Sequence, residues 1–199
     1  MITRMKRTVL ALALVSLAGP AIASPLSDAL RANGGTLCFT RSYDSAWLKA
    51  HPGQTVREVR FAIVENKDWH TLRMSLRGAG QPIYMLGECN WYAGDLNRGV
   101  QNDILDPGFK PTSGVGCHLY TDVTLSSAEE GGDFPVQWGD GKFIQAHLPE
   151  IVAAWRSYDV SRTATWPKLK RADRIIRLNR APASECRELV TRFAPGLPR

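Results

Sequence analysis

The stretch from Leu37 to Val56, LCFTRSYDSAWLKAHPGQTV, carries the residue types of a thiol hydrolase. It places Cys38, Asp44 and His51 within fourteen residues. Catalysis by cysteine needs a free thiol of low pKa beside a histidine, and a third group that orients the histidine. The spacing alone therefore allows two interpretations: an active site, or a disulfide-bonded strand that leads into a corner.

Three observations favour the structural interpretation. The chain has four cysteines, an even number that suits disulfide formation in an exported protein. Cys38 lies in a strand-like run and not at a helix N-terminus, where a thiolate would be stabilised. His51 precedes Pro52, so we expect it to end a short helical turn at residues 45–50.

The histidines form no recognisable catalytic or metal motif. They are His51, His70, His118 and His147. No two of them lie four residues apart, and H-E-x-x-H and G-x-S-x-G are absent from the sequence. His118 is expected to share a strand face with Tyr120 and Asp122, which we interpret as a partly exposed face; a polar site is the alternative. We predict no catalytic residue, metal or cofactor, and a hydrolase with distributed Asp, Glu and His residues is the alternative.

An acidic, glycine-rich segment includes Glu129, Glu130 and Asp133. Its residue types suit calcium, but it lacks the ligand spacing of an EF-hand loop. A turn before a strand is the simplest interpretation. Alternatively, an exposed acidic loop would bind a cationic partner, for example a lysozyme-like muramidase, so these three residues are our candidate partner-binding residues.

Residues 1–23 have the organisation of a secretory signal peptide. Three basic residues precede a short apolar run at 9–17, and Ala-Ile-Ala at 21–23 fits a small-residue cleavage site. The apolar run is shorter than the roughly 20 residues that a membrane span requires. We expect cleavage before Ser24 and export to the periplasm or beyond, which leaves residues 24–199 as a single domain without a membrane span.

Cleavage would lower the net charge, because three basic residues leave and the formal value falls from +6 to +3. The main basic cluster that remains is KLKRADRIIR at residues 168–177. We interpret it as a solvated face, with contact to an anionic surface as the alternative. Exported chains rarely meet nucleic acid, so we expect the partner to be an unidentified protein or an envelope ligand.

Four cysteines can pair in three ways. We favour the nested arrangement, in which Cys89–Cys117 joins two successive strands and Cys38–Cys186 joins the first strand to the C-terminal segment. Loops of these lengths contribute roughly 3–5 kcal/mol each on the chain-entropy account.

Period-two alternation of apolar and polar residues predicts an all-β protein with minor helices. About eight strands with short turns indicate an antiparallel meander, closed as a small barrel or folded as a sandwich. The expected strands are residues 36–43, 56–65, 71–77, 84–92, 115–123, 133–138, 142–148 and 174–180. Short helices are expected at residues 27–32, 45–50, 149–155 and 184–193, the last with Ser184 as N-cap.

One motif resembles a family of uncharacterised exported proteins of Gram-negative bacteria. The motif is Y-D-x-x-W-L-x-x-H-P-x-Q-x-V, formed here by residues 43–56 with Tyr43, Asp44, Trp47, His51 and Pro52. Family members usually carry histidine where this chain has Trp47, which favours a packing role for that position. They continue with L-R-G at 76–78, G-x-C at 87–89, and a cysteine before an acidic glycine-rich turn. The resemblance implies an exported β-rich domain and no particular activity.

The sequence therefore favours a non-enzymatic binding or accessory protein of the cell envelope. An inhibitor of a secreted hydrolase belongs to this class.

Overall fold

Eight antiparallel strands form where the sequence alternates apolar and polar residues. A computed structural model describes residues 24–66, 70–94, 113–122, 131–160 and 163–193. Within these ranges the strands are β1 (Thr36–Ser42), β2 (Val56–Val64), β3 (His70–Gly78), β4 (Ile83–Tyr92), β5 (Gly114–Leu119), β6 (Asp133–Gly139), β7 (Phe143–His147) and β8 (Ile175–Ala181). The predicted all-β class is confirmed.

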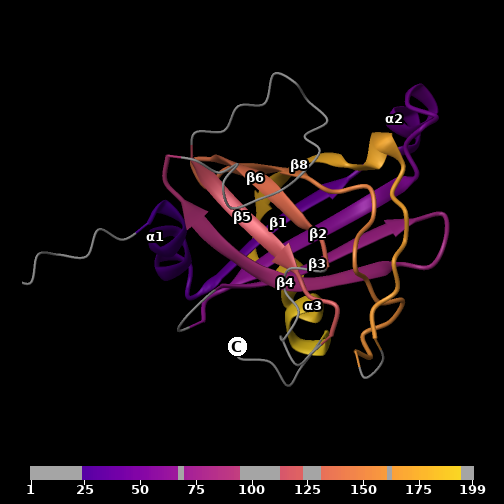
Figure 1. Cartoon of the computed structure of the whole chain (residues 1–199). Helices are drawn as coiled ribbons and strands as arrows, with labels where there is room; N and C mark the ends of the chain where they lie inside the picture. Colours follow the sequence, from indigo (N-terminus) through magenta and orange to yellow (C-terminus); the bar gives the residue numbers. More distant parts are fainter. Residues whose placement is uncertain (1–23, 67–69, 95–112, 123–130, 161–162, 194–199) are drawn as a thin grey trace, which may run out of the picture.

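The strands close into a barrel, which the sequence had not distinguished from a sandwich. Each strand pairs antiparallel with the next one along the chain, and β1 also pairs with β8. This last ladder runs from Cys38 opposite Ala181 to Thr40 opposite Asn179. Because β1 is paired on both sides, no strand of the meander remains an open edge (Figure 1).

Alternate residues of each strand fill the inside of the barrel. In β3 these are Leu72, Met74 and Leu76, all at most 3% exposed and part of one large apolar cluster. Phe39 packs edge-to-face on Phe61, with 6.5 Å between ring centroids. The inside is therefore a packed core of side chains.

A second apolar cluster lies on the outside of the barrel. The chain leaves β8 through a 3-10 turn, η3 (Ala183–Cys186), which leads into α3 (Arg187–Arg192). Leu189 and Phe193 are buried there against Ala62 and Leu86 of the barrel wall. Arg73 is also fully buried on this side, and its guanidinium donates to the Val190 carbonyl at 2.9 Å.

The two disulfides have the predicted nested pairing. Cys89–Cys117 links β4 to β5 and belongs to the inner cluster, whereas Cys38–Cys186 links β1 to η3 and belongs to the outer one. The four cysteines are all fully buried. Each of the two apolar clusters therefore contains one disulfide.

Two short helices lie at opposite ends of the barrel (Figure 1). Helix α1 (Pro25–Ala32) places Leu26 and Leu30 in the inner cluster, so it covers one end. Its first turn is capped by the Ser24 hydroxyl, which accepts the Ser27 backbone N–H at 3.1 Å. Helix α2 (Ser45–Ala50) lies at the other end and has no buried residue.

The helix expected at residues 149–155 is absent, and this prediction was wrong. The segment is extended because its backbone N–H groups donate to distant carbonyls: Val152 to Pro167, Ala154 to Thr165 and Trp155 to Tyr84. Residues 152–155 are buried consecutively, which no single helix face permits. We call residues 149–160 and 163–170 the strap.

Two further boundaries differ from expectation. The strand expected at 115–123 ends at Leu119, because the next residues bond to other partners: Tyr120 N–H donates to Leu86 and Ala164 N–H to Thr121. Ser184 does not cap the C-terminal helix, since it lies inside η3, which begins after Pro182. None of the helices in the described ranges has the length and apolar character that a membrane crossing requires. The predicted signal segment, residues 1–23, lies outside the described residues.

Candidate functional site

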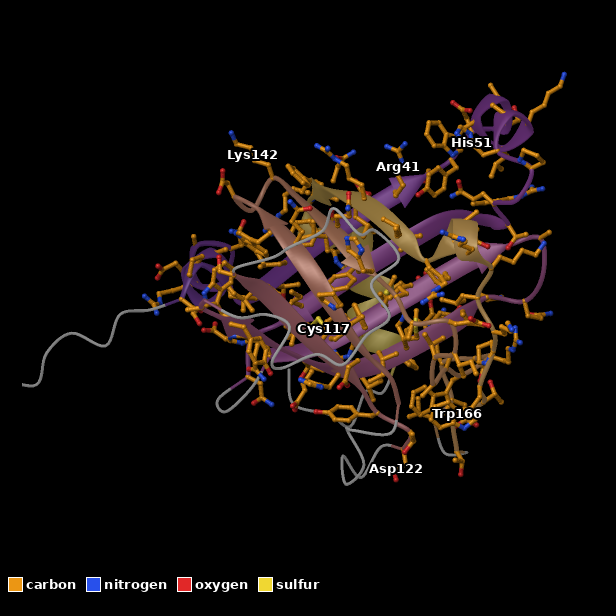
Figure 2. All side chains as sticks on the ribbon, turned by 45° about the horizontal axis from the view of Figure 1, so that its top comes forward. Arg41, His51, Cys117, Asp122, Lys142 and Trp166 are labelled. Atoms are coloured by element: carbon orange, nitrogen blue, oxygen red, sulfur yellow. A yellow bond between two sulfur atoms is a disulfide. The ribbon has the colours of Figure 1, made fainter. Side chains whose placement is uncertain are left out.

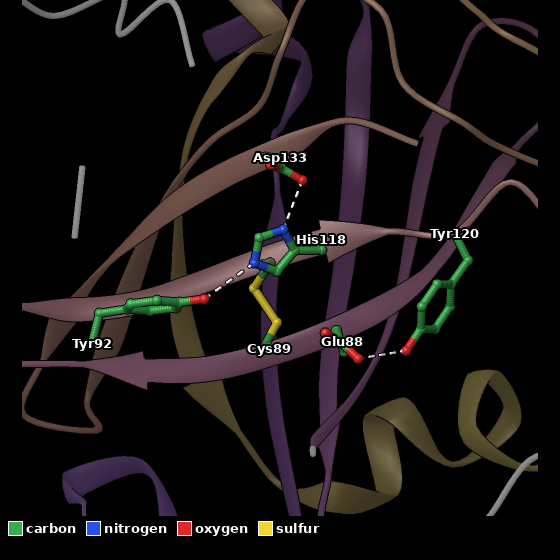
Figure 3. A network of polar contacts seen from close by, with 7 residues as sticks. Glu88, Cys89, Tyr92, His118, Tyr120 and Asp133 are labelled. Atoms are coloured by element: carbon green, nitrogen blue, oxygen red, sulfur yellow. Dashed lines mark hydrogen bonds and ion pairs between the residues drawn. A yellow bond between two sulfur atoms is a disulfide. The ribbon is translucent and has the colours of Figure 1, made fainter. Parts of the chain in front are cut away.

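A row of ionisable side chains crosses three neighbouring strands on the outer face of the barrel (Figure 3). Glu88 of β4 lies opposite His118 of β5, which in turn lies opposite Asp133 of β6. Antiparallel pairing brings side chains at opposite positions close together. His118 therefore stands between two carboxylates that are far from it in sequence.

The His118 imidazole joins Asp133 to Tyr92. The Asp133 carboxylate lies 2.8 Å from Nδ1, and the Tyr92 hydroxyl lies 3.2 Å from Nε2. A carboxylate oxygen accepts, so the Nδ1–H of the imidazole donates to Asp133, and Nε2 shares a hydrogen bond with the Tyr92 hydroxyl. The side chains of His118 and Asp133 are only 16% and 19% exposed.

Glu88 uses a different tyrosine. It accepts the Tyr120 hydroxyl at 2.8 Å. Burial, followed by the bond to Glu88, raises the pKa of Tyr120 well above its usual value. Burial, followed by the charges of Glu88 and Asp133, also raises the pKa of Tyr92. Both phenols are therefore held protonated.

This network has the outline of an acid–histidine–hydroxyl relay, but the hydroxyl is poorly suited to attack a substrate. A nucleophile needs its conjugate base to be favoured, and the raised pKa of Tyr92 acts in the opposite sense. The contacts instead hold β4, β5 and β6 in register. We therefore favour a positioning role for Asp133, His118 and Tyr92.

The triad-like residues of the opening stretch have three separate roles. Cys38 is bonded to Cys186 and fully buried, so it carries no free thiol. Asp44 caps α2 by accepting the Trp47 backbone N–H at 2.7 Å. His51 is the C-cap residue of the same helix.

The signature residues instead build an aromatic stack on α2, which we call the α2 stack. Tyr43 precedes the N-cap residue of α2, Trp47 lies in the helix and His51 is its C-cap, and their four-residue spacing brings the three side chains to one side of it. Ring centroids are 5.9 Å apart between Tyr43 and Trp47 and 4.0 Å apart between Trp47 and His51, and both pairs are stacked. The Arg41 guanidinium lies 5.0 Å from the Tyr43 ring centre.

Polar contacts hold the α2 stack in one conformation. The Trp47 indole N–H donates to Gln54 at 2.9 Å, and His51 Nδ1 bonds the Trp47 carbonyl at 2.9 Å. Trp47 nevertheless remains 40% exposed. Figure 2 shows α2, with His51, projecting beyond the strands. The molecule therefore presents a rigid, exposed aromatic and cationic feature at this end.

The predicted acidic patch is only partly described. Glu129 and Glu130 lie outside the described residues, and Asp133 is bonded to His118. Within the described ranges, no group of three or more His, Cys, Asp and Glu residues could hold a metal ion.

No known protein family, curated protein or solved structure matches this chain. The resemblance of residues 43–56 to exported bacterial proteins thus stays a prediction.

Sequence reasoning named most of these residues but not their contacts. His118 and Asp133 were each singled out, yet they are 15 positions apart and meet only through the β5–β6 register. The α2 stack had a readable signal, because Tyr43, Trp47 and His51 are spaced for one helix face.

Proposed function

We propose that this chain is a non-enzymatic binding protein of the cell envelope, which recognises a protein partner through the α2 stack. The observation that carries the proposal is an exposed tryptophan fixed between two other rings. Tryptophan, tyrosine and arginine dominate the energetic centres of protein interfaces. A side chain already held in one conformation loses little entropy on binding, so it contributes more to affinity.

The surroundings support a recognition role. Arg41 lies near the rings of both Tyr43 and Trp47, at 5.0 and 5.7 Å from their centres. A guanidinium beside aromatic rings offers both a planar contact surface and charged donors for a carboxylate. A partner with an acidic group beside an apolar surface would satisfy both features.

Export supports the same proposal. The pattern of residues 1–23 favours a signal peptide, and two buried disulfides suit an oxidising compartment. An envelope protein meets secreted hydrolases, so a muramidase that carries an acidic group beside an apolar part of its surface is one candidate partner. Screening purified protein against lysozymes tests this candidate, and no binding at micromolar concentration removes it.

Capture from an envelope extract tests the proposal. Immobilised wild-type protein, Trp47→Ala and Trp166→Ala are compared, because Trp166 is equally exposed but lies on the strap. A partner identified by mass spectrometry should be retained by wild type and Trp166→Ala and lost from Trp47→Ala. The same set of proteins on all three resins would refute a role for the α2 stack.

The alternative is a hydrolase, and the Asp133–His118 pair is the observation that favours it. Its test is turnover of chromogenic ester, peptide and glycoside substrates by wild type and His118→Gln. Turnover that depends on His118 would establish the alternative, whereas no turnover by the wild-type protein would remove it.

A further inference from the structure

The strap holds a second exposed apolar feature, separate from the α2 stack. Its two arms form a narrow antiparallel pair, with Ile151 opposite Lys168 and Ala154 opposite Thr165. Val152 and Ala154 are fully buried beneath it. The strap is therefore anchored to the barrel, and its outward side chains have fixed positions.

Two large apolar side chains point away from that anchor. Ile151 is 51% exposed and Trp166 is 49% exposed. Within the described residues, only one other large apolar side chain, Trp47, is comparably exposed. Unlike Trp47, Trp166 stacks on no ring, and its indole N–H has no hydrogen-bond partner within the described part of the chain. Figure 2 shows Trp166 well apart from His51 of α2.

Cationic side chains contribute to a cavity whose lining includes Pro167, the chain neighbour of Trp166, and Lys168, which lies opposite Ile151. The cavity holds about 370 Å³ and has Arg156, Lys168 and Lys170 in its lining. Its apolar lining is supplied by Val56, Leu76, Ile83, Pro167 and Leu169. An apolar hollow with a positive rim suits an amphiphile that carries an anionic group.

Part of the positive charge is not neutralised locally. Glu150 is paired with Lys168, and the other nearby carboxylate, Asp173, is buried and accepts from Thr55 and Val56. Among the residues that the structure describes, Arg156, Lys170 and Arg171 have no carboxylate within 4.0 Å. These three side chains are available to an external anion.

We propose that the strap docks on an anionic lipid surface. Trp166 and Ile151 enter the boundary between headgroups and acyl chains, while Arg156, Lys170 and Arg171 contact lipid phosphates. Tryptophan favours this boundary because its ring is apolar and its N–H is polar, and neighbouring Lys and Arg are attracted to anionic headgroups. This inference does not depend on the proposed partner of the α2 stack.

The geometry favours a lipid surface over a second protein site. Trp166 and Ile151 are two exposed apolar side chains on the strap, and the cationic side chains of Arg156, Lys168 and Lys170 belong to the same part of the molecule. A protein interface instead centres on a desolvated cluster of anchors, usually within about 800 Å² on each side. The boundary between headgroups and acyl chains can take up single apolar side chains, because lipids rearrange around each of them.

Vesicle flotation tests the proposal with the chain from Ser24 onward. Vesicles of phosphatidylcholine with 30 or so per cent phosphatidylglycerol are compared with vesicles of phosphatidylcholine alone, at low and high salt. We expect binding to the anionic vesicles only, weakened by salt. Removing one cation, as in Lys170→Gln, should weaken binding about fivefold, and Trp166→Ala should weaken it at least as much. Trp47→Ala is the matched control and should bind as wild type does.

Tryptophan fluorescence supplies a second readout that does not depend on affinity. Lipids brominated on their acyl chains should quench wild-type emission more than that of Trp166→Phe. Three results would each overturn the proposal. They are equal binding to neutral and anionic vesicles, vesicle binding by Trp166→Ala that equals that of the wild type, and binding to soluble acidic proteins but not to vesicles. Free inorganic phosphate that abolishes vesicle binding at millimolar concentration would identify a phosphate site instead of a lipid-docking surface.

Discussion

Removing the disulfide between Cys38 and Cys186 is expected to destabilise the fold more than removing the one between Cys89 and Cys117. The first pair spans 148 residues of sequence and the second spans 28. On the chain-entropy relation these separations correspond to about 5 and about 3.5 kcal/mol. Because the shorter loop lies inside the longer one, the effective outer loop shrinks, which lowers the first value by only about 0.2 kcal/mol.

The comparison isolates the loop effect because packing losses are similar in the two variants. All four cysteines are fully buried, so replacing either pair with alanine removes two sulfur atoms from an apolar cluster. The expected difference of about 1.3 kcal/mol therefore reflects the unfolded chain, which each cross-link restricts to a different extent.

Guanidinium unfolding followed by circular dichroism measures this difference. Wild type, Cys38→Ala/Cys186→Ala and Cys89→Ala/Cys117→Ala are compared under non-reducing conditions. We expect the wild type to be the most stable, the Cys89/Cys117 variant intermediate and the Cys38/Cys186 variant the least stable, at a cost that is a large share of the roughly 5–15 kcal/mol typical of a domain. Equal losses, or a larger loss from the Cys89/Cys117 variant, would refute the reasoning and make packing inside the barrel the dominant contribution.

Two further predictions concern the buried Asp173 and two partly buried tyrosines. Asp173→Ala should lower the free energy of unfolding by about 2–4 kcal/mol, because the backbone N–H groups of Thr55 and Val56 lose a carboxylate acceptor at 2.9 Å. Asp173→Asn keeps one side-chain oxygen and should lower it less. Equal losses for the two variants in chemical unfolding would contradict this. The pKa of Tyr92 is raised chiefly by burial, and burial with neighbouring Tyr84 raises the pKa of Tyr158 to about 12. These tyrosines are protonated in both the folded and the unfolded protein below pH 10, so they should not change the stability there. Stability should fall as the pH rises towards about 12, where the unfolded state has lost these protons and the folded state still holds them. Phenolate absorbance that shows every tyrosine of the native protein ionising near pH 10 would contradict this.

The strands were predictable from the sequence because the apolar residues that fill the inside of the barrel stand at every second position. Leu72, Met74 and Leu76 alternate with polar residues, and this local pattern is enough to place β3. Closure was not predictable, since it depends on β1 meeting β8 across about 140 residues of chain, and no local pattern reports such a pairing. The strap was misassigned for a related reason: Pro149 suits a helix start, but distant carbonyls set the conformation of the segment.

The candidate sites also differ in whether the local sequence was enough to predict them. The α2 stack is local, so the spacing of Tyr43, Trp47 and His51 contained its geometry. The His118–Asp133 contact is set by strand register, which the sequence did not fix. The exposure of Trp166 depends on how the strap is anchored, and this also required the tertiary structure.

The most direct test of the proposed function is the dissociation constant of a captured envelope partner, measured by calorimetry for wild type and Trp47→Ala. Interface centres of this kind contribute about 2 kcal/mol or more, so the variant should bind about 30-fold more weakly while its unfolding transition stays unchanged. Trp166→Ala should bind the partner as tightly as wild type. Affinities within about twofold for wild type and Trp47→Ala would contradict a binding role for the α2 stack.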